Sequence, residues 1–345
     1  MGDNLDIQPH WVEAFETVFG LCKIGRAERV AVLSESTSRA VLVELANRAL
    51  ANMGVSPETV RVPTPPPLPG PIIRSSGASV ALTGQEDAVR RLCDADVVID
   101  LTVEGLMHAP ETGAILKGGA RILNVSNEHP EILARLVPDP DMKPRVKEAV
   151  ARCRAANEMH VTSHAGTDLT VTLDGAATVG IWGWTDRPGT LAHWPAGLVV
   201  SFPKAGAVDG RLVFQPGDMN LTFKRYFESE VDCRIEGDHI TDIQGKGTDA
   251  RLMRDYFAGF DDPLAYATSH VGWGMNAGAR YEALTMYDKA DLNGTELRAV
   301  AGNFLYSTGA NEFAGRFTRG HFDLPMMGCD IALDGAFVVR DGTLV

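Results

Sequence analysis

The chain has 345 residues, 45% of them hydrophobic and 22% charged, the composition of an ordinary folded protein long enough for two domains. Its 45 acidic and 32 basic side chains give a formal net charge of −13, which would repel nucleic acid and anionic membrane surfaces. The amino terminus lacks the basic and apolar regions of a secretory signal, and no apolar stretch reaches the length of a membrane-spanning helix. We therefore expect a cytoplasmic protein that binds neither nucleic acid nor membranes.

The first part of the chain alternates amphipathic helical patterns with short apolar strands. Helices are expected at residues 10–24, from residue 37, at 85–95 and at 138–157, and strands at residues 29–33, 59–62, 97–101 and 121–125. Nearly continuous apolar strands are typical of a parallel sheet covered by helices on both faces. The proline-rich segment 63–71 can join neither a helix nor a sheet, because proline lacks an N–H, so it should be a surface connection. Residues 1–157 are thus predicted to form a Rossmann-like α/β domain.

After this segment the pattern changes to short strands separated by Gly, Pro and Asp. Strands are expected at residues 159–163, 169–173, 197–201 and 211–214, and helices at 250–257 and around 276–287. This pattern predicts an α+β, strand-rich domain over residues 158–345. No G-x-G-x-x-G or P-loop follows the strands of the first domain, and none of the five cysteines lies in a nucleophile motif. We expect neither a nucleotide cofactor nor thiolate chemistry.

His321 and Asp323 form an H-x-D pair that could bind a metal ion. On an extended strand, residues i and i+2 point to the same face, so an imidazole and a carboxylate at this spacing can share one ion. His270 precedes the glycine-rich sequence Gly-Trp-Gly and would complete a set of two imidazoles and one carboxylate. That set leaves open positions on non-haem Fe(II). A strand-surface hydrogen bond for the pair and a buried structural role for His270 are the alternatives.

Two other polar residues could act on a substrate. His108 follows the apolar strand 97–101, and open α/β sheets bind ligands beyond the carboxyl ends of their strands. His108 is therefore a candidate acid or base, with a surface or packing role as the alternative. Ser307 follows an apolar run and is a candidate for orienting a substrate, whereas the absence of G-x-S-x-G argues against a serine hydrolase.

His193 lies in the sequence Leu-Ala-His-Trp-Pro, not far from Trp182 and Trp184. An imidazole and indole rings in one loop could hold a flat ring by stacking. We take His193 and Trp184 as candidate substrate contacts. A packing role for the histidine is the alternative.

Together these residues give the chain a resemblance to the 2,5-dihydroxypyridine 5,6-dioxygenase family, ring-cleaving enzymes of bacterial nicotinate degradation. The resemblance extends over nearly the whole chain and is carried by HWP at 193–195, SHVGWG at 269–274, GNFLYSTG at 302–309 and HFDLP at 321–325. It implies one Fe(II) per subunit, bound by His270, His321 and Asp323. It also implies that His108 handles the substrate proton and that His193 and Ser307 lie near the substrate.

The reaction implied by the resemblance uses dioxygen to open a hydroxylated pyridine ring, and for 2,5-dihydroxypyridine the product would be N-formylmaleamate. The family also implies a homo-oligomer such as a hexamer. One position departs from the family pattern: Ile181 stands where a glutamate is expected, in the strand before the Trp-x-x-x-Pro-Gly turn. The ring accepted by this chain could therefore differ.

A more distant resemblance links the chain to the thermophilic-type metallo-aminopeptidases. They share the Gly-Thr-Asp-Leu turn at 166–169 and the late H-x-D pair, but they bind two metals and need a glutamate in a Pro-x-Gly-Glu loop. The corresponding segment 203–207, PKAGA, has no glutamate. A hydrolase that uses Zn(II) to activate water, or a non-catalytic binding protein on the same scaffold, remains the alternative to a dioxygenase.

Overall fold

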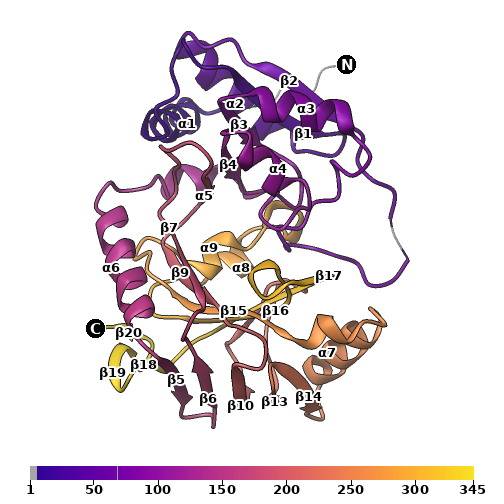
Figure 1. Ribbon diagram of the computed structural model, residues 1–345, viewed down its shortest axis with the longest axis vertical. Helices are drawn as coiled ribbons and strands as arrows, with labels where there is room; N and C mark the ends of the chain where they lie inside the picture. Colours follow the sequence, from indigo (N-terminus) through magenta and orange to yellow (C-terminus); the bar gives the residue numbers. More distant parts are fainter. Residues whose placement is uncertain (1–5, 68) are drawn as a thin grey trace.

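The computed structural model describes residues 6–67 and 69–345, which fold into two lobes (Figure 1). The upper lobe contains a five-stranded sheet of order β2-β1-β3-β4-β8, and all its neighbouring strands are parallel. Its strands are β1 (Val30–Glu35), β2 (Glu58–Val62), β3 (Val97–Asp100), β4 (Arg121–Val125) and β8 (Leu191–Trp194). The predicted parallel α/β sheet is confirmed.

Both faces of the central strands of this sheet are buried, which explains why β1, β3 and β4 are mostly apolar. Val30 and Val32 of β1 pack in one cluster with the first two helices, whereas Ala31 and Leu33 pack in another with the next two. Because side chains alternate along a strand, a strand covered on both faces needs apolar residues at every position. The helices of this lobe are α1 (Pro9–Leu21), α2 (Ala40–Asn52), α3 (Glu86–Asp94), α4 (Thr112–Lys117) and α5 (Pro130–Arg135).

The fifth strand of the upper sheet comes from beyond residue 157. Strand β8 pairs in parallel with β4, with His193 opposite Asn124 and Trp194 opposite Val125. Trp194 is fully buried against Phe15 of α1, at a ring-centroid distance of 5.1 Å. The chain thus returns to the first sheet after the helix α6 (Met142–Ala155). A division into residues 1–157 and 158–345 stays a prediction.

The lower lobe consists mainly of two antiparallel sheets. The eight-stranded sheet has the order β14-β13-β10-β6-β5-β18-β19-β20, and the five-stranded sheet has the order β17-β16-β15-β9-β7. The strands of the first are β5 (Glu158–Ser163), β6 (Asp168–Thr172), β10 (Val208–Phe214), β13 (Val231–Glu236), β14 (His239–Gln244), β18 (Cys329–Leu333), β19 (Ala336–Arg340) and β20 (Thr343–Leu344). Those of the second are β7 (Ala177–Ile181), β9 (Leu198–Phe202), β15 (Thr268–Gly274), β16 (Phe304–Asn311) and β17 (Arg316–Met326).

The two lower sheets share one hydrophobic core, which includes Val161 and Leu212 of the larger sheet and Val199, Val271 and Phe322 of the smaller. The opposite face of the smaller sheet is turned toward the upper lobe, and the alternate residues along its strands lie there. Strand-rich α+β structure is therefore confirmed for this part of the chain. The remaining elements are β11 (Met219–Asn220), β12 (Arg225–Tyr226), α7 (Thr248–Ala258), α8 (Ala283–Met286), α9 (Thr295–Arg298), η1 (Pro263–Tyr266), η2 (Lys289–Asp291) and η3 (Glu312–Ala314).

The helix expected around residues 276–287 is mostly wrong, since only the four residues of α8 are helical. The Asn276 side chain accepts a hydrogen bond from Gly278 N at 2.9 Å, and Asn276 N donates to Ala299 O. An asparagine that bonds the backbone two residues ahead favours a turn over a helix.

Glu128 joins the upper lobe to the start of α9. Its buried carboxylate accepts hydrogen bonds from the backbone N–H groups of Asn293, Gly294 and Thr295, at 2.9, 2.9 and 2.6 Å.

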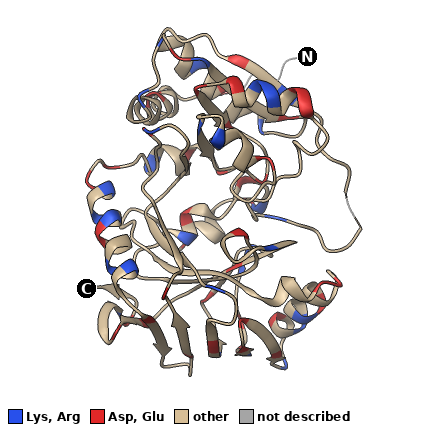
Figure 2. Cartoon of the chain, in the orientation of Figure 1, with Lys and Arg blue, Asp and Glu red and all other residues tan. Residues whose placement is uncertain are grey.

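Acidic and basic residues are interspersed along the helices of both lobes in the view of Figure 2. No helix within the described ranges is long and apolar enough to cross a membrane.

Asp218 should make the stability of the protein depend on pH. It is buried, accepts hydrogen bonds from Gln215 N and Met327 N, and burial raises its pKa from 3.8 to about 6. Between these two values the folded state binds more protons than the unfolded state, so Asp218 lowers stability as the pH rises through that window. Asparagine does not titrate in this range. The unfolding free energy of Asp218→Asn minus that of the wild type should therefore increase by about 2 kcal/mol from pH 4 to pH 7.

Urea unfolding of the metal-free protein at several pH values measures this difference. Asp174→Asn, at an exposed position, is the control and should follow the wild-type curve. If the Asp218→Asn and wild-type curves run parallel, the buried carboxyl is not the cause of the pH dependence.

Candidate active site

A cavity lies between the lobes, on the face of the five-stranded sheet that is turned toward the upper lobe. His270 reaches it from β15, and His321 and Asp323 reach it from β17. Strand β16 separates these two strands, with Ser307 opposite Asp323 and Gly309 opposite His321. The period of a strand therefore places His321 and Asp323 on one face, as the sequence spacing predicts.

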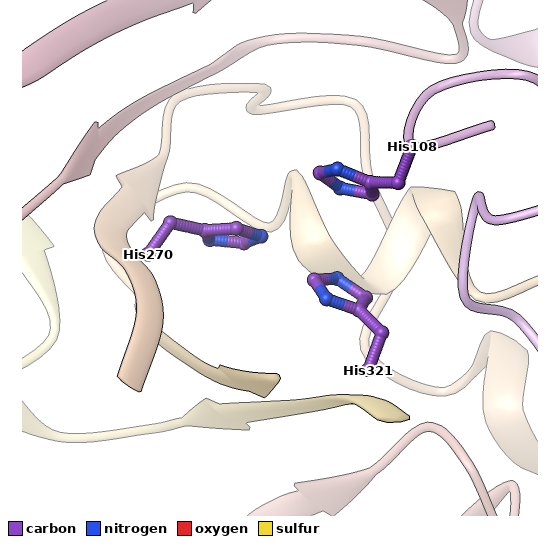
Figure 3. A group of neighbouring side chains, drawn as sticks. All are labelled: His108, His270 and His321. Carbon is purple, nitrogen blue, oxygen red and sulfur yellow. The ribbon is translucent and has the colours of Figure 1, made fainter. Parts of the chain in front are cut away.

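The two histidines and the aspartate converge in the structure. Asp323 Oδ1 lies 3.3 Å from His321 Nε2 and 3.8 Å from His270 Nε2, and all three residues are buried. His108 joins them from the upper lobe: a ring nitrogen of each of the three histidines lies within 4.8 Å of the others (Figure 3). The site thus offers four possible ligands, of which a metal could take His270 and His321 with either Asp323 or His108.

The ionisation states of these groups suit a divalent cation. Burial, with smaller contributions from neighbouring positive groups, lowers the pKa of His270 to about 3, so its imidazole is neutral. Burial by itself would raise the pKa of Asp323, but the Arg298 guanidinium and then His321 hold it well below its usual range. Neutral imidazole and ionised carboxylate are the forms that bind metals.

One ring nitrogen of each of these two histidines faces the carboxylate. His270 Nε2 and His321 Nε2 are the atoms nearest Asp323 Oδ1, whereas the other nitrogen of each ring, Nδ1, is buried and has no hydrogen-bond partner among the described residues. Two imidazole nitrogens and a carboxylate oxygen that converge in this way are ligands typical of a divalent metal ion. The residues therefore fit a metal ion.

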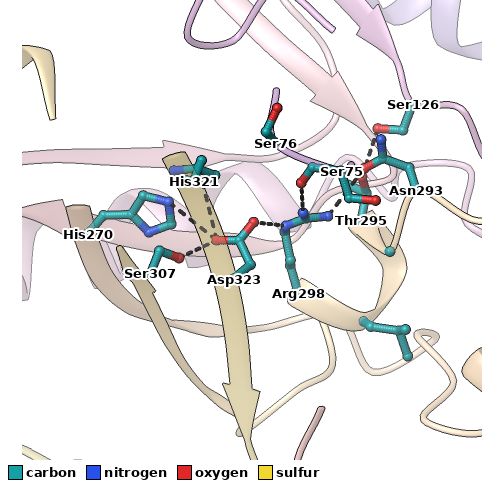
Figure 4. Close-up of polar contacts among 12 residues, drawn as sticks. Ser75, Ser76, Ser126, His270, Asn293, Thr295, Arg298, Ser307, His321 and Asp323 are labelled. Atoms are coloured by element: carbon teal, nitrogen blue, oxygen red, sulfur yellow. Dashed lines mark hydrogen bonds and ion pairs between the residues drawn. The ribbon is translucent and has the colours of Figure 1, made fainter. Parts of the chain in front are cut away.

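Arg298 and Ser307 orient the Asp323 carboxylate (Figure 4). Arg298 Nε donates to Asp323 Oδ2 at 2.6 Å, and the Ser307 hydroxyl donates to Asp323 Oδ1. The same guanidinium donates to the backbone carbonyl of Ser75 and to Asn293 Oδ1. Ser307 thus contacts the aspartate, and it does not line the cavity. Sequence reasoning missed Arg298, which stands in no recognisable motif.

His108 is held from two sides. Its backbone N–H donates to Gly77 O at 2.6 Å, and its ring Nδ1 lies 3.1 Å from Glu312 Oε1. Glu312 belongs to the turn between β16 and β17, so a residue of the lower lobe orients a histidine of the upper lobe. The other ring nitrogen of His108, Nε2, takes no part in the contact with Glu312. The structure therefore brings His108 of the upper lobe to the wall of the cavity.

His193 lines the cavity, whereas Trp184 does not. The His193 Nδ1–H donates to Pro195 O at 2.6 Å, which leaves Nε2 as an acceptor, and burial lowers its pKa to about 4. Trp184 is buried in the core of the upper lobe, in the same cluster as Trp194. The Trp184 ring packs against the protein core. The position of Trp184 therefore does not support the predicted stacking of a substrate on this residue.

The floor of the cavity is apolar and comes from the five-stranded sheet. Residues of β7, β9 and β16 that alternate with core residues point to this side: Val179, Ile181, Leu198, Val200, Phe202 and Leu305. Ile181, at the position where a glutamate is expected from the resemblance, lies within this floor. The opposite wall is polar and includes Asn124, Ser126 and Thr295. A flat ring with polar substituents on one edge would suit such a cavity.

The fold and the buried histidine–carboxylate cluster together define an enzyme with a candidate metal centre between two lobes. The family model of 2,5-dihydroxypyridine 5,6-dioxygenase (NicX) matches residues 10–345. The 2,5-dihydroxypyridine 5,6-dioxygenase of Pseudomonas putida KT2440 is 37% identical over 337 residues, which cover 96% of this chain and 95% of the relative. The chain belongs to the 2,5-dihydroxypyridine 5,6-dioxygenase family, and the predicted resemblance is confirmed.

Solved structures agree with this assignment. The structure of the dioxygenase from Pseudomonas putida KT2440 superimposes with a TM-score of 0.92 at 36% identity, covering 97% of this chain and 96% of the other. Wild-type AmpT from Thermus thermophilus superimposes with a TM-score of 0.66 at 14% identity, covering 97% and 99% of the two chains. This second likeness is one of fold alone.

Loss of the Arg298 charge should destabilise the metal-free protein. Arg298→Met would leave the buried Asp323 carboxylate without its cation, at a cost of about 3 kcal/mol in unfolding free energy. Arg298→Lys should lose less, because it keeps the charge without the planar geometry. Urea unfolding measures both. Arg234→Met removes an exposed pair with Glu236 and should change stability by less than about 0.5 kcal/mol; equal effects of the two methionine variants would contradict the role of Arg298.

Proposed function

We propose that this protein is an Fe(II)-dependent ring-cleaving dioxygenase of hydroxylated pyridines, with 2,5-dihydroxypyridine as its substrate and N-formylmaleamate as the product. One Fe(II) per subunit would be held by His270, His321 and Asp323. The observation that carries the proposal is the buried convergence of these three side chains in a member of the 2,5-dihydroxypyridine 5,6-dioxygenase family. The enzyme would act in the cytoplasm in nicotinate degradation, as a homo-oligomer such as a hexamer.

Fe(II) bound in this way supplies open positions through which a ring and dioxygen exchange electrons. In the overall reaction both oxygen atoms enter the product and the bond between ring carbons 5 and 6 breaks. The protein residues then have three tasks: to hold the ring, to remove its proton and to exclude water.

In this proposal His108 would take the proton. Its Nδ1 is oriented by Glu312, and its ring lies 4.7 Å from that of His321, measured between centroids. A base next to the metal site can remove a proton from the ring hydroxyl or nitrogen, which raises electron density at the carbon that oxygen attacks. His193 would hold the ring through Nε2, which is free to accept a hydrogen bond from an N–H or O–H group.

The choice between Asp323 and His108 as the third ligand can be tested by metal analysis. After anaerobic purification with Fe(II), His321→Ala and Asp323→Ala should contain little iron, because each loses a ligand. His108→Ala should keep its iron and lose about 100-fold or more in kcat, since it lacks only the base. His164→Ala, at an exposed position, is the control. Loss of iron from His108→Ala with retention in Asp323→Ala would instead favour a three-histidine site.

The reaction itself can be tested by oxygen uptake. The Fe(II)-loaded protein should consume one dioxygen per 2,5-dihydroxypyridine, and ¹⁸O₂ should place two labelled atoms in the product. A metal-dependent hydrolase on the same scaffold would bind Zn(II) and show no oxygen uptake on any hydroxylated ring. That second result would overturn the proposed function.

A further inference from the structure

A long connection brings a segment of the upper lobe into the cavity. Between β2 and α3, the described residues of the connection 63–85 form neither helix nor strand. The connection runs along the lower lobe, where Arg319 donates to Pro69 O at 3.0 Å and Tyr256 donates to Ile72 O at 3.3 Å. It then enters the cavity wall at Ser75 (Figure 4). Connections this long within a compact protein are often functional.

Ser75 combines three unusual features. Its backbone φ of +57° lies in the left-handed region, which non-glycine residues rarely adopt. It is 5% exposed, and its hydroxyl has no hydrogen-bond partner in the described chain. Burying an unpaired hydroxyl costs stability, and glycine would adopt this backbone without strain. A serine that incurs both costs at a cavity wall indicates a role in binding.

The strained backbone of Ser75 is held in place on both sides. Its carbonyl oxygen accepts a hydrogen bond from Arg298 Nη2, and the next residue, Ser76, donates from its backbone N–H to Glu104 Oε2 at 2.8 Å. Two residues on, Gly77 O accepts from the backbone N–H of His108. These contacts fix the Ser75 backbone between the Arg298–Asp323 pair and the His108 loop.

Other hydroxyl groups around the cavity have partners within the protein. Ser76 Oγ donates to Glu104 Oε2, and Thr295 Oγ1 donates to Ser126 Oγ at 3.0 Å. Ser75 Oγ thus differs from these neighbouring hydroxyls in having no partner within the described chain. A serine hydroxyl that has no acceptor within the protein can donate a hydrogen bond to an oxygen substituent of a ring.

We propose that Ser75 is a substrate-binding residue whose hydroxyl donates a hydrogen bond to one oxygen substituent of the ring. The inference rests on the proposed function, which it deepens by assigning a contact to one of the two ring oxygens. With the Ser75 hydroxyl at one edge and the apolar floor under the ring face, the ring would be oriented before it reacts.

The test combines removal of the hydroxyl with removal of each ring oxygen. Wild type, Ser75→Ala and Ser75→Gly, loaded with Fe(II) under anaerobic conditions, are titrated with 2,5-dihydroxypyridine, 2-hydroxypyridine and 3-hydroxypyridine in a calorimeter. Both variants should bind 2,5-dihydroxypyridine about tenfold more weakly, the effect of one lost hydrogen bond. They should also weaken binding of only one of the two monohydroxy rings, and their iron content should equal that of the wild type.

The two variants separate the hydroxyl from the backbone strain, since glycine relieves the strain and also keeps the test possible if alanine prevents folding. Ser79→Ala is the matched control: it lies in the same connection, its hydroxyl accepts from Ala81 N at 3.2 Å, and it does not line the cavity. Unchanged binding of all three rings, or equal weakening of all three, would overturn the assignment of Ser75. A wild type that binds none of the rings would contradict the proposed function itself, and the inference with it.

Discussion

The ionised carboxylate of Asp323, buried between the two lobes, is the constraint on which the site depends. A buried charge is costly unless cations and hydrogen-bond donors surround it. Arg298 and Ser307 meet this requirement, and each fixes one oxygen of the carboxylate. Arg298 in turn is placed by α9, whose start is bound by Glu128 of the upper lobe. The position of one carboxylate therefore depends on contacts that involve both lobes.

The two lobes contribute different kinds of residue to the cavity. The five-stranded sheet supplies an apolar floor, because residues such as Val200 and Leu305 alternate with residues of the lower core. The carboxyl ends of the parallel strands and the loops that follow them supply polar groups, including His193 of β8 and His108. An aromatic ring with oxygen substituents matches this division, with its face on the apolar side and its polar groups toward the loops. Ile181 makes the floor uniformly apolar at the position where the family resemblance would place a glutamate.

Sequence patterns were informative wherever the relevant interaction was local or repeated. Continuous apolar runs predict the strands of the parallel sheet, and the spacing of His321 and Asp323 predicts that they share a face. The same patterns failed where long-range contacts decide the structure. Strand β8 joins a sheet from which it is separated by several elements, and Trp184, although close in sequence to His193, turns into a hydrophobic core.

The sequence by itself determined the fold class, the family and the residues that carry the family motifs, because periodicity and contiguous motifs are properties of neighbouring residues. Only the tertiary structure decided which groups surround them. Arg298, Glu312 and Ser75 come from three separate segments, and none stands in a motif. Their roles arise from a buried charge that needs a partner, a ring nitrogen that needs orienting, and a strained backbone held by hydrogen bonds from elsewhere in the chain. Such requirements exist only once distant segments are packed together.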